Sequence, residues 1–508
     1  MHLRKFIRDS LGYAISQYLV RFLTTVRGLV AARLLGPGGY GAWNAIMLIM
    51  DYGTYAPAGT FSGLDQAVPA RIVDGDAARL DRLKRAGLLN VMLSTGVFAA
   101  AALLYFSGST GQIANKWGFG GVVVAVACVA LQALSYYHLT LLRSHGNITA
   151  VSVWFLLQGT IGVGLGLALA LHPALGHWGL LWGWFVGTVV ATLSVMWQGR
   201  AVVPLIPTVA RESLTLLSIG FPMFIYTVSN FVMRSFDRII IFRFLGIHDL
   251  GLYGLAVMAV GFLLTLPDAI AYVIYPQLVR RYREHGETPG AIRDQVERAM
   301  RALSILMPAM CALAYLAADD AVDWLLPSFH DGVPALRILC FSAAGLSLAN
   351  LGSIVLMTLG RQRVLVPVAL GMTTLGVVLD LIAIRLGHGI RGVAWATFVT
   401  YAVNSAVLIM IAERGMGGSP RSRVMVLARV LLPLAIAIPL AYGFERFFPG
   451  YGPPGPMRTL RLVGSVVGWL ILYGVLIVPL ARGIGLRRLV SEIEWPWSAR
   501  RRGEAPRG

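Results

Sequence analysis

Charge is scarce in this chain. Only 13% of its 508 residues are charged, whereas soluble domains carry about 25%. The hydrophobic share is 57% and the mean hydropathy is +0.70. A soluble core cannot hold so many long apolar runs, each close to the roughly 20 residues that a membrane-spanning helix needs. The scarcity of charge therefore excludes a soluble protein and predicts an integral membrane protein.

The apolar runs also lack the alternation of polar and apolar residues that marks a transmembrane β-barrel, and this disfavours a barrel. Cysteine is rare as well, since Cys128, Cys311 and Cys340 stand singly in apolar segments. We expect them to be small core residues. The sequence contains no zinc spacing, glycine-rich phosphate loop or Ser/His/Asp set. We therefore expect no catalytic residues, no metal and no cofactor.

Lysine is nearly absent: the net charge of +19 rests on 40 arginines and three lysines. A positive charge of this size raises nucleic acid as a partner. However, the basic residues are scattered among short segments between apolar runs, with no soluble domain to form a groove. The positive-inside rule of membrane proteins explains them better, so we expect no nucleic-acid partner.

Apolar windows separated by charged residues or Gly/Pro breaks predict about fourteen transmembrane helices and an all-α membrane fold. The predicted helices lie near residues 12–35, 39–59, 86–107, 118–142, 147–171, 176–198, 214–245, 252–279, 300–326, 333–359, 364–386, 391–412, 424–445 and 459–481. They divide the chain into a six-helix part, a second six-helix part, and a helix pair with a basic cytoplasmic tail. The corresponding predicted domains are 1–199, 200–415 and 416–508.

The basic residues predict the orientation. With the N-terminus in the cytoplasm, 29 basic residues fall in inside segments and seven in outside segments. Cytoplasmic segments are the ones enriched in Lys and Arg, so both termini are predicted to be cytoplasmic. The segment after the basic N-terminus is too long and too arginine-rich for a signal peptide, and we expect no cleavable signal. The stretch from Arg280 to Arg301 is predicted to be the longest cytoplasmic loop, with a short surface helix.

A weak repeat relates the two six-helix parts. The chain reads ARLLGPGGYG in the first predicted helix pair and FRFLGIHDLGLYG in the seventh and eighth predicted helices. An offset of 210 sets Arg33 against Arg243, and Tyr40 recurs as Tyr253 after a three-residue insertion. Each copy predicts a helix, a glycine-rich turn on the outer face and a return helix. Because each part has an even number of helices, the two parts share one orientation and are related by an axis along the membrane normal.

Seven arginines interrupt the predicted helices. They are Arg21, Arg27, Arg33, Arg234, Arg238, Arg243 and Arg429. An arginine near the bilayer centre costs from about 2.5 to more than 10 kcal/mol, so it persists where it faces water or a partner. At about 1.5 Å per residue from the helix ends, Arg21, Arg27, Arg234 and Arg238 reach mid-depth, whereas Arg33 and Arg243 can snorkel to the interface.

The mid-depth arginines outnumber their acidic neighbours. Asp237 lies beside Arg238 and three residues from Arg234, so its carboxylate satisfies only part of two guanidinium charges. We expect it to orient both. A net cationic cavity suits an anionic transported substrate, because arginine holds phosphate oxygens in a bidentate fork and cannot lose its proton.

Three further acids lie in apolar runs of other predicted helices: Asp51, Asp268 and Asp380. Two interpretations stay open for them. They are either counter-ions that pair with the arginines, or groups that couple transport to protons or sodium.

Asp319, Asp320 and Asp323 form DDAVD, which matches the DDxxD pattern by which membrane prenyltransferases hold magnesium and diphosphate. A magnesium site would need a second acidic cluster, and none accompanies this one. We expect a solvated helix end here.

Five stretches that together span nearly the whole chain resemble the Wzx-type polysaccharide flippases of the multidrug/oligosaccharidyl-lipid/polysaccharide exporter (MOP) superfamily. They are ARLLGPGGYGAW, DRIIIFRFLGIHDLGLYGLA, YPQLVRRY, PALRIL and GIRGVAWATFVTY. The resemblance implies two six-helix lobes in a V, with a central cavity lined by helices 1, 2, 7 and 8. It also implies alternating access that moves an undecaprenyl-diphosphate-linked oligosaccharide from the inner to the outer leaflet of a bacterial inner membrane. The last two helices resemble the pair that forms a lipid-tail groove in lipid II flippases.

Under this resemblance, the cationic residues that bind the diphosphate are Arg21, Arg27, Arg234 and Arg238. The expected partners are the lipid-linked oligosaccharide and membrane lipid, with a polysaccharide polymerase and chain-length proteins as candidates, and we expect a monomer. Two alternatives stay open. A cation-coupled multidrug antiporter of the same superfamily should have an acidic or aromatic cavity. A membrane-embedded glycan polymerase or ligase should have a sizeable outer loop, whereas the outer segments here are short.

Overall fold

The computed structural model describes residues 3–108, 118–172, 175–200, 203–204, 206, 211–447 and 456–481. These residues form helices, turns and short connections, and none of them forms a strand. Several predicted features lie outside the described residues: the segment around Lys116, most of the linker at 201–210, and the basic tail from Arg482.

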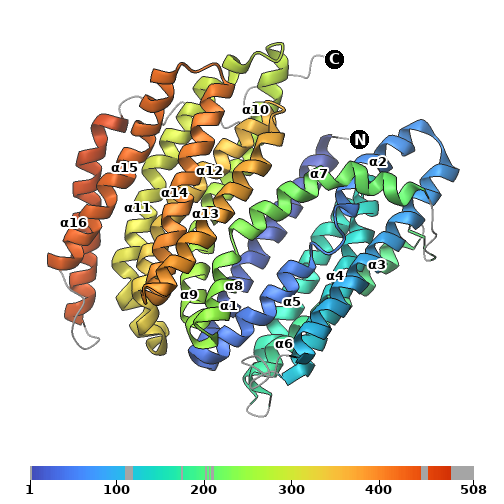
Figure 1. Cartoon of the computed structure of the whole chain (residues 1–508), viewed down its shortest axis with the longest axis horizontal. Coiled ribbons are helices and arrows are strands. Elements are labelled where there is room, and N and C mark those ends of the chain that lie inside the picture. Colours follow the sequence, from blue (N-terminus) through green and yellow to red (C-terminus); the bar gives the residue numbers. More distant parts are fainter. Residues whose placement is uncertain are drawn as a thin grey trace. The chain divides into compact units, whose positions relative to one another are not determined.

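Figure 1 shows the helices along the chain. They are α1 (Leu3–Gly53), α2 (Thr60–Asp74), α3 (Ala77–Gly108), α4 (Gly118–Ser144), α5 (Ile148–Ala170), α6 (Gly176–Gly199), α7 (Glu212–Met233), α8 (Phe236–Phe244), α9 (Ile247–Leu263), α10 (Thr265–Glu284), α11 (Arg293–Leu325), α12 (Val333–Thr358), α13 (Leu365–Arg385), α14 (Gly389–Gly415), α15 (Pro420–Phe447) and α16 (Pro456–Ala481), with 3₁₀ turns η1 (Pro289–Ile292), η2 (Pro327–Gly332) and η3 (Gln362–Val364).

Twelve helical stretches of the described chain are long and apolar enough to cross a membrane. They coincide with the third to fourteenth predicted helices. The first two predicted helices meet within α1, which bends at Gly36, where φ is +62°. Glycine adopts this left-handed conformation without the steric cost that a Cβ would bring. The prediction of an all-α, multi-pass membrane protein is confirmed.

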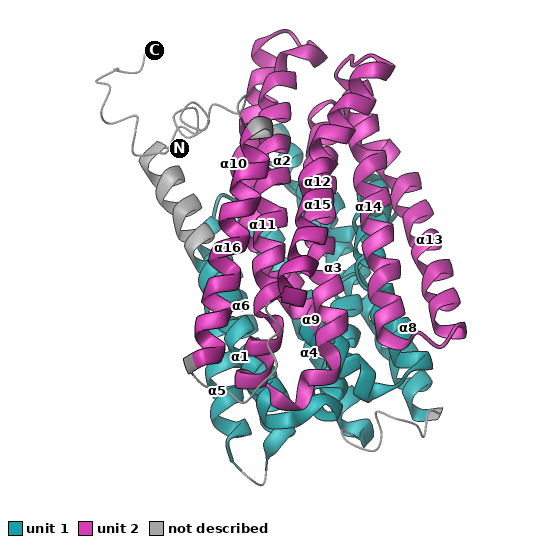
Figure 2. Ribbon diagram, turned by 90° about the vertical axis from the view of Figure 1, so that its left-hand side faces the viewer, with its two compact units in different colours: residues 1–255 teal, residues 256–508 magenta. Residues whose placement is uncertain are grey.

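The chain forms two compact units, residues 1–255 and 256–508, coloured teal and magenta in Figure 2. The boundary falls inside α9, so α7, α8 and the first part of α9 belong to the first unit. The predicted domains 1–199, 200–415 and 416–508 describe lobes of a transport cycle, and they stay a prediction.

Glycines bring helix backbones together in the first unit. A Cβ added to Gly183 of α6 would lie 2.2 Å from Cα of Gly166 in α5. A Cβ added to Gly251 of α9 would lie 1.9 Å from the carbonyl oxygen of Pro37 in α1. Small residues permit such contacts between membrane helices, where packing replaces the hydrophobic effect as the driving force. The start of α9 is thereby fixed against the second half of α1.

The second predicted helix, 39–59, does not end where it was expected to. The helix stops at Gly53, the chain turns through residues 54–59, and α2 follows. Pro57 lies in this turn, and Ala58 and Gly59 have φ values of +48° and +87°. A residue with positive φ cannot continue a right-handed helix, so the helix ends before the apolar run does.

The predicted helices 214–245 and 252–279 are also each broken once. In the first, Arg234 and Ser235 donate their N–H groups to carbonyls three residues back, and the Ser235 hydroxyl donates to the Phe231 carbonyl at 2.8 Å. These bonds replace the α-helical ones and separate α7 from α8. In the second, a break at Leu264 separates α9 from α10. Pro267 follows three residues later and has no N–H for the next helical bond.

The predicted long loop from Arg280 to Arg301 is much shorter in the structure. Helix α10 continues to Glu284 and α11 begins at Arg293, with the 3₁₀ turn η1 between them. The expected short surface helix is therefore this single turn.

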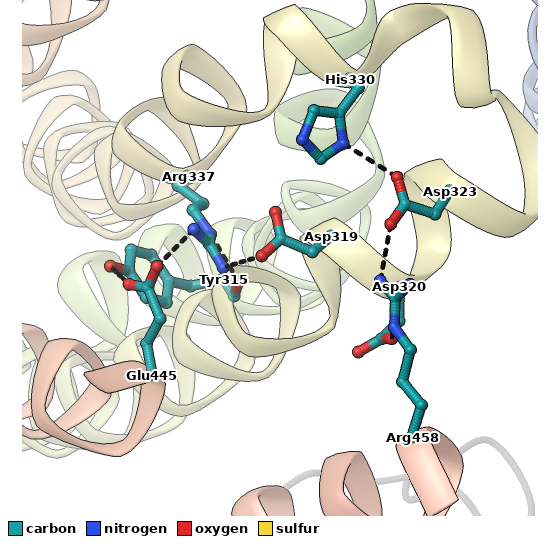
Figure 3. Close-up of polar contacts among 8 residues, drawn as sticks. All are labelled: Tyr315, Asp319, Asp320, Asp323, His330, Arg337, Glu445 and Arg458. Carbon is teal, nitrogen blue, oxygen red and sulfur yellow. Dashed lines mark hydrogen bonds and ion pairs between the residues drawn. The ribbon is translucent and has the colours of Figure 1, made fainter. Parts of the chain in front are cut away.

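In the second unit, two arginines join four helices near the end of α11 (Figure 3). We call these residues the arginine clasp: Asp319, Asp320 and Asp323 of α11, Arg337 of α12, Glu445 of α15 and Arg458 of α16. Arg458 pairs with Asp320 and places Nη2 2.7 Å from Oδ2 of Asp323. Arg337 contacts Asp319 at 2.7 Å and also pairs with Glu445.

The expectation of a solvated helix end at DDAVD is wrong for Asp320, which is only 4% exposed. Its carboxylate tolerates burial because Arg458, itself 8% exposed, neutralises it. A buried carboxylate without such a partner is strongly unfavourable. The acids of this motif therefore hold α16 against α11.

Candidate functional site

Two helix breaks of the first unit lie against each other. The hydroxyl groups of Tyr52, at the end of α1, and Ser235, between α7 and α8, are 2.8 Å apart. The ring of Phe231 in α7 lies 4.9 Å from the ring of Tyr52 and 4.8 Å from that of Tyr55, which is in the turn before α2. Irregular backbone at membrane depth is typical of transporter binding sites, because it is tolerated where it lines a cavity.

Charged side chains gather beside these breaks. We call them the charged cluster: Arg27, Asp51, Arg234, Asp237 and Arg238. Nη1 of Arg238 is 4.0 Å from Oδ2 of Asp51, and Arg27 is close enough to interact with Asp51 electrostatically. The cluster holds three arginines and two aspartates, which leaves one positive charge in excess.

Arg27 is the most unusual member of the cluster. It is only 7% exposed, and its guanidinium carbon lies 5.1 Å from the ring centre of Trp43 and 4.4 Å from that of Trp184. Its Nε and Nη1 atoms are buried and find no hydrogen-bond acceptor among the described residues. Cation–π contacts contribute about 2 kcal/mol or more when desolvated, but each unsatisfied buried donor costs about 1–3 kcal/mol. Arg27 therefore offers two donors that an anion could satisfy.

Asp237 is buried and held by two hydrogen bonds. The hydroxyl of Tyr253 donates to Oδ2 at 2.6 Å, and the main-chain N–H of Arg238 donates to Oδ1 at 2.8 Å. In the sequence repeat, Tyr253 matches Tyr40, which interacts electrostatically with Arg27. An offset of 210 sets Arg27 against Asp237. Each copy of the repeat thus places a tyrosine beside a charged residue, with the sign of the charge reversed.

The structure brings together some of the predicted site residues. Arg27, Arg238 and Asp51 are neighbours, and the contact of Asp51 with Arg238 fits the counter-ion interpretation of Asp51. Arg21 is half-buried in α1, six residues before Arg27. At about 100° per residue its side chain leaves the helix roughly 120° away from that of Arg27. Arg234 is half-buried and caps the end of α7.

The two other predicted acids lie in the second unit. Asp268 is in the first turn of α10, and Asp380 is fully buried in α13. The choice between counter-ion and coupling group stays open for both. Among the described residues, no group of three or more His, Cys, Asp and Glu side chains could hold a metal ion.

Four side chains of this site are not predicted from the sequence: Trp43, Trp184, Tyr52 and Ser235. Trp43 ends the quoted stretch ARLLGPGGYGAW, and Trp184 belongs to the tryptophan-rich stretch WGLLWGW of α6. Neither pattern indicates which cation the ring contacts. Only tertiary packing reveals that both indoles lie against Arg27.

Comparisons with known proteins identify a family and a fold. A family model described as "Polysaccharide biosynthesis protein" matches residues 30–334. A search of curated proteins found no match. Among solved structures, an inward-facing multidrug resistance transporter of the MATE family in the MOP superfamily is similar, with 16% identity and a TM-score of 0.68 over 78% of this chain and 94% of that one.

The lipid II flippase MurJ, in an inward closed conformation, has 11% identity and a TM-score of 0.67 over 92% of this chain and 99% of that one. A MOP-superfamily transporter from Pyrococcus furiosus has 16% identity and a TM-score of 0.58 over 81% and 95%. At these identities the likeness concerns the fold, which is that of MOP-superfamily transporters.

Proposed function

Because the chain belongs to the polysaccharide biosynthesis protein family, we propose that it is a flippase for an undecaprenyl-diphosphate-linked oligosaccharide. It moves this lipid from the cytoplasmic to the outer leaflet of a bacterial inner membrane by alternating access between two lobes, residues 1–199 and 200–415. The helix pair α15–α16 within residues 416–508 contacts the lipid tail. The transported oligosaccharide serves the synthesis of O-antigen, capsule or exopolysaccharide.

The observation that carries this proposal is the buried, unsatisfied guanidinium of Arg27. A diphosphate supplies the acceptor oxygens that Nε and Nη1 lack among the described residues. Arg238 is similar, since its Nε is also buried without an acceptor there and its Nη1 lies 4.0 Å from Oδ2 of Asp51. Arginine cannot lose its proton, so these donors remain available to an anion throughout the cycle.

The remaining predicted residues complete the proposed site. Arg21 and Arg234 extend the positive surface along α1 and at the end of α7, and Asp237 orients the arginines next to it in sequence. Helix α8 begins at Phe236, two residues after Arg234. The N-terminus of a helix carries partial positive charge, and broken helices of transporters direct such ends at anionic substrate groups. Both features suit a doubly negative headgroup.

The proposal is tested by replacing Arg27 with alanine and measuring translocation of the lipid-linked oligosaccharide in proteoliposomes. Loss of a charge-assisted contact of about 1.5–3 kcal/mol should slow translocation about 10- to 100-fold. Arg27→Lys should be intermediate, because it keeps the charge but loses the bidentate fork. Arg33→Ala is the matched control, since Arg33 lies exposed on the same helix. Wild-type rates for Arg27→Ala would contradict the proposal.

The same proteoliposomes separate the alternative functions. In the charged cluster of this chain arginines exceed acids, whereas a cation-coupled antiporter should have an acidic or aromatic cavity. Cation-dependent export of a lipophilic dye would favour the multidrug antiporter. Release of free undecaprenyl diphosphate would favour a polymerase or ligase. For the flippase, we propose a monomer with both termini in the cytoplasm, a polysaccharide polymerase and chain-length proteins as partners, and no enzymatic activity.

A further inference from the structure

Three aromatic rings form a continuous surface at the two facing helix breaks. Phe231 meets Tyr52 edge-on, at 74° between the ring planes, and lies more nearly parallel to Tyr55, at 33°. All three side chains are half-buried, so each ring keeps part of its surface accessible. We call these three residues the aromatic shelf.

The two tyrosine hydroxyl groups of the shelf differ in their hydrogen bonding. The Tyr52 hydroxyl is 2.8 Å from the Ser235 hydroxyl, which fixes its ring at the α7–α8 break. The Tyr55 hydroxyl makes no hydrogen bond to a described residue and is not buried. Buried tyrosine hydroxyl groups usually find a partner. Tyr55 therefore presents one accessible donor beside apolar ring surface.

The shelf adjoins the charged cluster. Tyr55 is close enough to interact electrostatically with Asp51 and Arg234, and Tyr52 with Arg238 and Asp51. The side chain of Asp51 is 41% exposed, so one of its oxygens can accept a further hydrogen bond. Apolar ring faces next to one donor and one acceptor form a site that matches a sugar ring, which presents C–H groups on its face and hydroxyl groups at its edge.

We propose that the aromatic shelf binds the first sugar of the lipid-linked oligosaccharide. This inference rests on the proposed function, since it takes the diphosphate to lie at the charged cluster. The first sugar is bonded directly to the diphosphate, so the surface that holds it must adjoin the arginines. The shelf meets that requirement through Tyr55 and Arg234. The shelf makes the site selective for lipid that already carries sugar.

Two lipids test the inference in proteoliposomes: undecaprenyl diphosphate alone, and undecaprenyl diphosphate bearing one N-acetylhexosamine. Wild-type protein should move both, with the sugar-bearing lipid favoured. Phe231→Leu keeps apolar volume and removes the ring, so it should lower that preference about three- to tenfold by slowing transport of the sugar-bearing lipid more than that of the bare lipid. Tyr55→Leu should lower the preference in the same way. With two variants, the test stands even if one of them folds poorly. Tyr55→Phe, which keeps the ring, should have the smaller effect.

Phe221→Leu is the matched control. Phe221 lies on the same helix, α7, is 50% exposed and stacks on Phe224 at 6.0 Å instead. Its replacement should leave the preference at the wild-type value. A preference that stays at that value in both Phe231→Leu and Tyr55→Leu overturns the shelf alone. A wild-type protein that moves neither lipid overturns the proposed function, and the shelf with it.

Discussion

A guanidinium group stays buried in a membrane helix only if other groups replace the water around it. For Arg27 these groups are two indole faces, which accept positive charge but supply no acceptor for its N–H groups. A carboxylate in hydrogen-bond contact would neutralise the arginine and compete with an anionic ligand. The tryptophans stabilise the cation and leave Nε and Nη1 without an acceptor among the described residues. Under the proposed function, this arrangement suits an anion that binds Arg27 and is then released.

Asp237 differs from Arg27, because its buried carboxylate is stabilised by hydrogen-bond donors within the protein. Replacing Tyr253 with phenylalanine removes the hydroxyl that donates to Asp237 at 2.6 Å and changes little in shape. Loss of a hydrogen bond to a charged group should lower the free energy of unfolding by about 1.5–3 kcal/mol. The measurement is the midpoint of thermal unfolding in detergent, which should fall.

Tyr55→Phe is the control for this change. It also removes one tyrosine hydroxyl, but that hydroxyl bonds to no described residue, so its unfolding midpoint should stay near the wild-type value. Equal midpoints for the Tyr253 and Tyr55 variants would mean that the Tyr253 hydroxyl does not stabilise Asp237.

At the scale of helices, the arginine clasp explains how α16 is attached. Arg458 lies near the start of α16; its contact with Asp320 is buried, and its contact with Asp323 is half-buried. At the other end of the contact, the Tyr473 hydroxyl donates to the Ile305 carbonyl at 3.0 Å, so α16 is tied to α11 at two levels. His330 adds a contact of 2.8 Å to Asp323 (Figure 3). The C-terminal pair therefore belongs structurally to the second unit.

Arg458→Ala should loosen this attachment. It leaves the buried Asp320 carboxylate without its cation, and breaking a buried pair in this way costs about 3–5 kcal/mol. We expect a lower unfolding midpoint and faster proteolysis between α15 and α16. Arg461→Ala should have little effect, because Arg461 is exposed one turn further along the same helix. Identical behaviour of the two variants would show that the clasp does not hold α16.

Across the whole molecule, the sequence predicts the positions of twelve apolar helical stretches of the described chain well, because spanning a bilayer imposes length and hydropathy on each of them. It does not predict the breaks at 54–59 and 234–235, because these depend on single φ angles and on one hydroxyl that competes for a carbonyl. Arg27 and Arg238 are identifiable from their cost in lipid. Trp184 is not, because it reaches Arg27 only through the packing of α6 on α1.

The predicted orientation can be measured on the whole chain, because Cys128, Cys311 and Cys340 are all buried. A single introduced cysteine therefore reports its own position to a membrane-impermeant maleimide. Gln362 and His388 are exposed in the turns at the two ends of α13. Since arginines are enriched on the cytoplasmic side, Gln362→Cys should react only in inverted vesicles and His388→Cys only in spheroplasts.

Each outcome of this labelling has a definite meaning for the transport direction. Reversed labelling would place the basic segments outside. It would contradict the predicted orientation and, with it, the proposed direction of transport. Reaction of both cysteines from one side would mean that α13 does not span the membrane, although its 24-residue stretch Gln362–Arg385 has a mean hydropathy of 2.0 in its most apolar window. Labelling from opposite sides, in the predicted order, would confirm the predicted orientation, on which the proposed outward movement of the lipid depends.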